Sequence, residues 1–88
     1  MSAIFTEFVG TLFFLYVILA TNNALAIGAA LAIAILIGGP ISGGCFNPAV
    51  TIALAAAGKL EMQSVMPYIL AQVAGALAAL ELYKRVKL

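Results

Sequence analysis

Three long hydrophobic stretches follow one another along the chain, and short polar segments separate them. The stretches cover about residues 4–20, 24–37 and 66–83, and the polar triplet Thr21-Asn22-Asn23 separates the first two. A helix needs about 20 apolar residues to cross a hydrocarbon core of about 30 Å, so the first two stretches are slightly short for a span. The pattern predicts an all-α membrane protein with three transmembrane helices.

The segment between the second and third stretches, about residues 39–57, has a different pattern. Gly38-Gly39-Pro40 predicts the end of the second helix, because Gly and Pro interrupt helices. Farther on, Asn47 is a favoured helix N-cap and Pro48 suits the first helical position. A helix from Pro48 to about residue 57 would be roughly 15 Å long, or half of the membrane. We therefore predict a re-entrant loop and a half-helix, whose irregular backbone must be buried in protein or line a water-filled cavity.

The composition agrees with a membrane protein and narrows its function. Hydrophobic residues make up 66% of the chain and charged residues only 8%, whereas about 25% of a soluble domain is charged. Histidine is absent and Cys45 is the single cysteine, so we expect no metal site, no cofactor and no intrachain disulfide. The net charge of +1, without a basic run, gives no case for a nucleic-acid partner. The sequence offers no nucleophile–base set, so we do not expect an enzyme.

Three motifs make the chain resemble one repeat of the aquaporin (major intrinsic protein) family, and they follow one another in the order and at the spacing found in that family. They are Glu7-Phe8-Val9-Gly10-Thr11, the segment from Ser42 to Thr51 that contains Asn47-Pro48-Ala49, and Ala71-Gln72-Val73-Ala74-Gly75-Ala76. Members of that family contain two such repeats in inverted orientation, with two half-helices that meet at the midplane. Val50 follows Asn-Pro-Ala here, as in the first repeat. The resemblance implies that a pore requires two inverted copies of this chain, and that family tetramers would become eight chains with four pores.

The resemblance also implies a role for the residues of the loop and the half-helix. Asn47 would cap the half-helix with its side-chain oxygen and donate from its amide nitrogen into the lumen. Together with the positive end of the helix, this would repel cations and orient a passing water molecule. The backbone carbonyls of Gly43, Gly44 and Cys45 would act as acceptors along the path. The alternative interpretation is that Asn47 is only the N-cap of a buried helix.

Two polar residues of the long helices are candidates for supporting the loop. Glu7 is a charge within a predicted span, which is costly and therefore marks a functional candidate. The resemblance implies that Glu7 accepts hydrogen bonds from the re-entrant loop and that Gln72 also supports it. The alternative interpretation is that Glu7 carries protons in a small dual-topology transporter.

The resemblance places the pore constriction at aliphatic residues. Aligned from Asn47, the family's selectivity-filter positions correspond to Ile27, Ile35 and Val50, and no arginine is present there. Hydrophobic constrictions can gate by dewetting, so we expect slow water permeation or a preference for small neutral solutes such as glycerol. Alternatively, these three residues face lipid or a neighbouring helix.

The charges at the ends of the predicted spans leave the orientation in the membrane open. Lys59 and the N-terminal amine lie on one side, and Lys84, Arg85 and Lys87 lie on the other. This weak bias permits insertion in both orientations, although a single orientation also fits. Apart from an inverted pair of this chain and a small dual-topology transporter, a third interpretation is that the chain is an accessory subunit that requires a separate second-repeat chain.

Overall fold

A computed structural model of the protein describes residues 1–86 and consists of helices joined by short connections. The helices are α1 (Ala3–Thr21), α2 (Ala24–Ser42), α3 (Pro48–Ala56), the 3-10 helix η1 (Met62–Ser64) and α4 (Val65–Arg85). Three helical segments, Ala3–Thr21, Ala24–Ser42 and Met62–Arg85, are long and apolar enough to cross a membrane. The prediction of an all-α protein with three long apolar helices and one shorter helix is confirmed. Of the three cationic residues that follow the third hydrophobic stretch, Lys87 lies outside the described residues.

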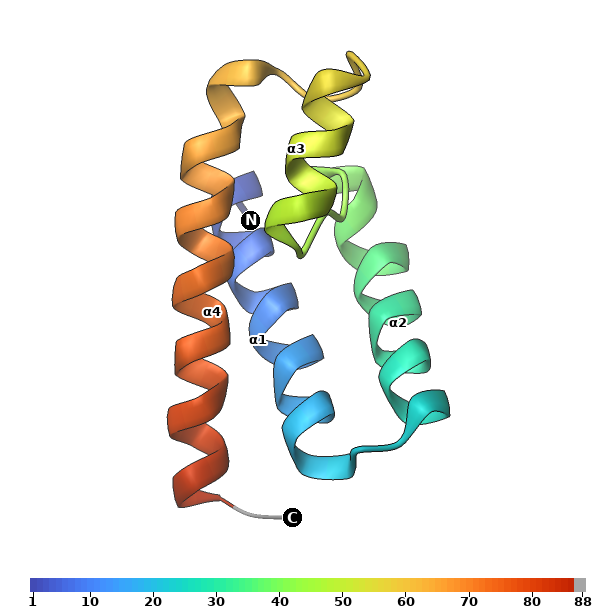
Figure 1. Cartoon of the computed structure of the whole chain (residues 1–88), viewed down its shortest axis with the longest axis vertical. Coiled ribbons are helices and arrows are strands. Elements are labelled where there is room, and N and C mark those ends of the chain that lie inside the picture. Colours follow the sequence, from blue (N-terminus) through green and yellow to red (C-terminus); the bar gives the residue numbers. More distant parts are fainter. Residues whose placement is uncertain (87–88) are drawn as a thin grey trace.

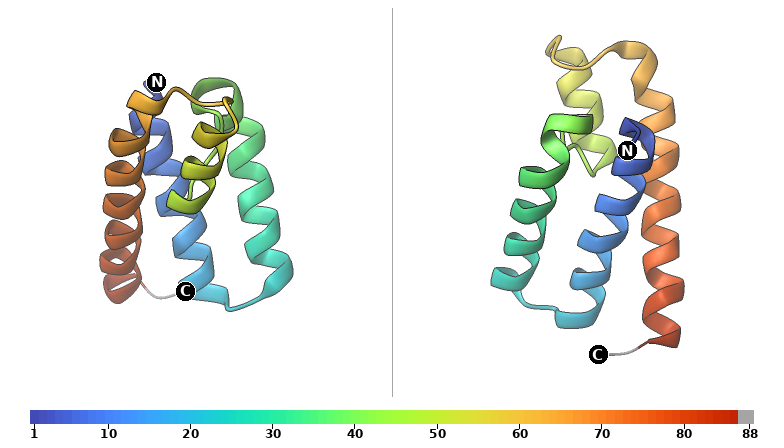
Figure 2. Two further views of the ribbon diagram at one scale, coloured as in Figure 1. Left: turned by 45° about the horizontal axis from the view of Figure 1, so that its top comes forward. Right: turned by 180° about the vertical axis from the view of Figure 1, so that it is seen from behind.

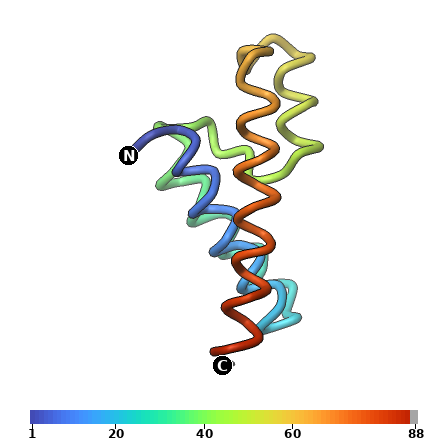
Figure 3. The backbone as a smooth tube through the Cα atoms, turned by 90° about the vertical axis from the view of Figure 1, so that its left-hand side faces the viewer, coloured from blue at the N-terminus to red at the C-terminus, as the bar shows by residue number. Residues whose placement is uncertain are grey.

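The long helices form a bundle in which α1 lies between α2 and α4 (Figures 1 and 2). The bundle is 39 Å long, and its other two dimensions are 23 and 22 Å. Figure 3 shows that α4 crosses the α1–α2 pair at an angle, so that the two diverge towards the end of the molecule where α3 lies. The short helix α3 begins about half-way along the bundle, beside α4, and returns to the end at which α2 finished.

The second helix continues through the point at which the sequence predicts its end. We predicted an end at residue 37 and a loop from residue 39, whereas α2 reaches Ser42 with Pro40 inside it. The fixed φ of proline fits a helix, so Pro40 removes only the hydrogen bond that its missing N–H would make to the carbonyl of Leu36. Helices in membranes tolerate such a loss because neighbouring groups can satisfy the freed carbonyl. Gly43 stops the helix instead, because it adopts a left-handed φ of 92° while its N–H donates to the Gly39 carbonyl at 2.8 Å. The loop is consequently confined to residues 43–47.

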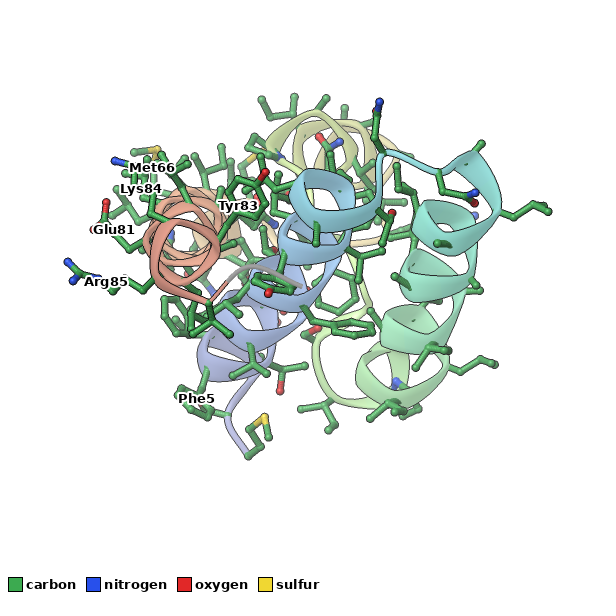
Figure 4. All side chains as sticks on the ribbon, turned by 90° about the horizontal axis from the view of Figure 1, so that it is seen from below. Phe5, Met66, Glu81, Tyr83, Lys84 and Arg85 are labelled. Atoms are coloured by element: carbon green, nitrogen blue, oxygen red, sulfur yellow. The ribbon has the colours of Figure 1, made fainter. Side chains whose placement is uncertain are left out.

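The close approach of α1 and α4 depends on small residues. Ala71, Gly75 and Ala79 are buried along one side of α4. A Cβ atom added at Gly75 would lie 2.5 Å from the carbonyl oxygen of Phe8, so only glycine fits there without displacement of a helix. Small residues at this spacing are typical of helix contacts in membranes. The charged side chains of Glu81, Lys84 and Arg85 point away from this contact, on the outer side of α4 (Figure 4).

Candidate functional site

The loop between α2 and α3 is held by the carboxylate of Glu7 on α1. Glu7 is fully buried, with 0% of its surface exposed. Its carboxylate accepts four hydrogen bonds. Oε2 accepts from the Ser42 hydroxyl at 2.6 Å and from the Cys45 N–H at 3.2 Å. Oε1 accepts from the Phe46 N–H and from Gln72 Nε2, each at 2.8 Å. Four hydrogen bonds to one carboxylate disperse its charge, which compensates for its removal from water. In residues 1–86 no salt bridge involves Glu7.

These bonds fix the direction of the loop backbone. Because the amides of Cys45 and Phe46 donate to Glu7, these N–H groups point towards α1. Within the described part of the chain, the carbonyl oxygens of Gly43, Gly44 and Cys45 accept no hydrogen bond. Gly43 and Gly44 have left-handed φ angles of 92° and 66°, a conformation that glycine adopts without steric cost. The loop thus holds three unpaired acceptors in a row.

Asn47 caps α3, as its residue type predicts. Its Oδ1 accepts from the Ala49 N–H at 2.7 Å, and its carbonyl accepts from both the N–H and the hydroxyl of Thr51 at 2.9 Å. The side chain of Asn47 is exposed, and no group among residues 1–86 accepts a hydrogen bond from its amide nitrogen. Pro48 occupies the first turn of α3. The N-terminus of α3 therefore presents a free amide donor about half-way along the bundle (Figure 1).

Helix α4 supports both sides of the loop. Gln72 Nε2 donates to Thr51 Oγ1 at 2.7 Å as well as to Glu7, and the Tyr68 hydroxyl donates to the Ser42 carbonyl at 2.7 Å. No individual role was predicted for Ser42, Thr51 or Tyr68 from the sequence. The role of Tyr68 could have been predicted, because Tyr68 lies one turn before Gln72 and therefore on the same face of α4.

Phe46 fills the space between α1 and α2. Its ring is 2% exposed, and Cβ atoms added at Gly10 or Gly38 would lie 2.2 Å and 2.8 Å from ring carbons. Phe46 adopts a φ of 53°, which is uncommon for a bulky residue. Its N–H bond to Glu7 and its buried ring together hold it there. The absence of a side chain at Gly10 and Gly38 thus leaves the space that the Phe46 ring occupies.

The three predicted constriction residues do not form one ring within a single chain. Ile27 is half-buried in the first turn of α2, at the end of the bundle opposite to α3 (Figure 1). Ile35 and Val50 are 42% and 40% exposed, and Ile35 lies beside Gly44 of the loop. Ile35 and Val50 are therefore associated with the loop half of the molecule, and Ile27 with the other half.

Two open grooves adjoin the loop. One, of about 360 Å³, lies between α1 and α2 and has almost wholly apolar walls. The other, of about 460 Å³, lies between α1 and α4 and includes Asn47 and Pro48 at the start of α3. Among residues 1–86 no group of three or more His, Cys, Asp or Glu side chains could hold a metal ion.

Comparison with known proteins places these features in a family. The chain matches the major intrinsic protein family over residues 1–87. It is 46% identical to "Aquaglyceroporin AqpS" of Rhizobium meliloti (strain 1021) over 64% of this chain and 24% of that protein. It is 53% identical to "Aquaporin Z" of Brucella melitensis over 64% of this chain and 25% of that protein. "Glycerol uptake facilitator protein-like 6" of Lactiplantibacillus plantarum is 39% identical over 83% of this chain and 38% of that protein. No solved structure matches.

The chain thus spans between about a quarter and two fifths of the length of these relatives. Its three apolar helices and its family make it an integral, multi-pass membrane protein. The family match covers nearly all of the chain, including all three motifs and the loop that Glu7 holds. The chain belongs to the major intrinsic protein family.

Proposed function

We propose that the chain forms a passive transmembrane channel for water or small neutral solutes such as glycerol. The observation that carries the proposal is the loop before α3, whose amides bind Glu7 while the carbonyls of Gly43, Gly44 and Cys45 remain unpaired in the described chain. These carbonyls are suited to replace the hydrogen bonds that a permeating molecule loses on leaving water. The names of the similar proteins, which include an aquaporin and glycerol facilitators, support the same class of permeant.

The pore is formed by two copies in opposite orientations. α3 has nine residues, which extend over roughly 14 Å, so one copy supplies a half-helix for only half of the membrane. An inverted second copy supplies the other half, with the two Asn47-Pro48-Ala49 segments meeting at the midplane. Their helix N-termini and amide donors exclude cations and orient a central water molecule. By resemblance to the family, four such pairs make an assembly of eight chains, surrounded by lipid.

The distribution of the constriction residues supports this inverted arrangement. Ile27 is at one end of the bundle, and Ile35 and Val50 belong to the other half. Inversion of the second copy brings Ile27 of one copy level with Ile35 and Val50 of the other. Each mouth is then aliphatic, which favours small neutral solutes over ions.

Proton-coupled transport through Glu7 is the second candidate, and its hydrogen bonds weigh against it. All four partners of the carboxylate donate to it, so a proton on Glu7 would have to displace one of these donors. The third candidate, an accessory subunit, differs in requiring a separate second-repeat chain before any flux occurs.

The test is stopped-flow light scattering of proteoliposomes that contain only this chain, under water and glycerol gradients. We expect flux with a low activation energy. Asn47→Asp places a charge at the midplane and should reduce glycerol flux at least about tenfold, which is ~1.4 kcal/mol in the barrier. Asn23→Asp is the matched control, because Asn23 caps α2 in the turn at the end of the bundle. Flux equal to that of empty vesicles, from folded protein, would contradict the homomeric pore and favour the accessory subunit.

A further inference from the structure

Two buried polar atoms in the structure have no hydrogen-bond partner among residues 1–86. They are the hydroxyl oxygen of Thr11 and the side-chain carbonyl oxygen Oε1 of Gln72. The two residues are 2% and 1% exposed. Both line the groove of about 460 Å³ between α1 and α4, which also includes Asn47. Since buried polar atoms without partners are rare and costly, the position of this pair calls for an explanation.

The orientation of Gln72 follows from its other contacts. Its Nε2 donates to Glu7 Oε1 at 2.8 Å and to Thr51 Oγ1 at 2.7 Å. The Thr51 hydroxyl hydrogen is committed to the Asn47 carbonyl at 2.9 Å, so Thr51 is an acceptor towards Gln72. A flipped amide would place Oε1 against two acceptors. Oε1 therefore faces away from Glu7 and Thr51, and it is left with unused lone pairs.

Thr11 is held close to the same part of α4. A Cβ atom added at Gly75 would lie 3.3 Å from the Thr11 Cβ atom, and Gly75 is one turn along α4 from Gln72. The Thr11 hydroxyl can both donate and accept, Gln72 Oε1 accepts, and the free Asn47 amide donates. Among the residues that the structure describes, the remaining walls of the groove are apolar and none is charged. This combination of groups suits a small neutral molecule with hydroxyl groups and does not suit an ion.

We propose that Thr11, Gln72 and Asn47 form a polar subsite that binds water or a hydroxyl group of a small polyol. A bound molecule with two or more of these partners would satisfy the unpaired atoms. The further claim that the bound molecule is the one that permeates rests on the proposed function. On that claim, Thr11 contacts the solute beyond the Asn-Pro-Ala segment and influences the choice between water and glycerol.

The occupancy of the subsite can be measured without any flux. The chain contains four threonines, at positions 6, 11, 21 and 51. In water-edited solid-state NMR of threonine-labelled protein in bilayers, we expect magnetisation to reach Thr11 from water as quickly as it reaches the exposed Thr21. Thr51, which is 0% exposed and whose hydroxyl is paired, should respond slowly. Thr11→Val assigns the Thr11 signal. Transfer to Thr11 as slow as to Thr51 would overturn the subsite, whatever the flux.

The role of the subsite in permeation is tested with paired variants. Thr11→Val removes the hydroxyl and keeps the shape, and we expect it to lower glycerol flux about fivefold, the effect of one lost hydrogen bond. Thr11→Ser keeps the hydroxyl, and we expect it to restore most of the glycerol flux that Thr11→Val loses. Equal glycerol flux in the wild-type protein and in both variants would overturn the claim that Thr11 contacts the permeating solute. If the wild-type protein shows no flux, the proposed function fails, and the NMR measurement alone decides on the subsite.

Discussion

At the scale of the residue, the cost of burying the Glu7 carboxylate depends on the groups that donate to it. A charge in an apolar helix is tolerated when each lone pair has a donor. Glu7 has donors from α2, from the loop and from α4, namely Ser42, Cys45, Phe46 and Gln72. One side chain therefore connects three segments. We therefore expect substitution of Glu7 to disturb mainly the structure of the loop between α2 and α3.

We expect Glu7→Gln to destabilise the fold by about 2–4 kcal/mol, because an amide group would face donors that need acceptors. Cys45 offers a direct measurement, since it is the single cysteine and is 3% exposed. A thiol-reactive dye should label Cys45 at a lower temperature in the variant than in the wild-type protein. Glu81→Gln, at an exposed position on α4, should leave the labelling unchanged. A variant with unaltered labelling would instead agree with a proton-carrying Glu7 in an intact fold.

At the scale of the element, the distance between α1 and α4 determines whether Gln72 can reach Glu7 and Thr51. That distance is set by glycine, because Gly75 lies directly against the backbone of α1 near Phe8. Similarly, Gly10 and Gly38 make room for the Phe46 ring between α1 and α2. The helices thus position the loop through contacts that tolerate no added methyl group.

Gly75→Ala should lower stability by about 1–3 kcal/mol, because the new methyl group would meet backbone atoms of α1 and force the helices apart. Gly28→Ala is the matched control. A Cβ atom there meets no atom of residues 1–86 within 4 Å, and alanine favours the helix by up to about 1 kcal/mol. Thermal unfolding in detergent, followed by circular dichroism, compares the two. Equal unfolding temperatures would show that α1 and α4 can separate without cost.

At the scale of the whole molecule, the two ends of the bundle differ in which connections they carry. The segment between α3 and α4, which includes Lys59, is at one end, and the turn between α1 and α2 is at the other (Figure 1). An inverted pair requires that both orientations occur in the same membrane. The small difference in positive charge between the ends permits this.

We expect reporter cysteines at opposite ends of the bundle to be labelled to the same extent. In a Cys45→Ser background, Met62→Cys and Leu25→Cys place thiols at positions that are 68% and 85% exposed. With a membrane-impermeant reagent, each should be labelled to about half in intact cells if both orientations are equally populated. Complete labelling of one and none of the other would establish a single orientation and contradict the inverted homodimer.

Features that depend only on neighbouring residues could be predicted from the sequence alone. The three long helices follow from continuous apolar stretches, and the start of α3 follows from the capping preference of Asn47 and the fixed φ of Pro48. These signals act within one or two helical turns, so composition and order are sufficient to read them. The three motifs taken together also predicted the family, to which the chain belongs.

Features that depend on distant residues follow from the packing of the helices. Ser42 lies 35 positions from Glu7 along the chain and Gln72 lies 65, so no local pattern indicated that they share one carboxylate. Local rules ended α2 too early, because Pro40 removes one hydrogen bond from a helix that its other hydrogen bonds and its packing against α1 still hold. The unpaired atoms of Thr11 and Gln72 likewise became visible only when α1 and α4 lay side by side. Hydrogen bonding between helices is set by their packing, which brings together groups that the order of residues keeps apart.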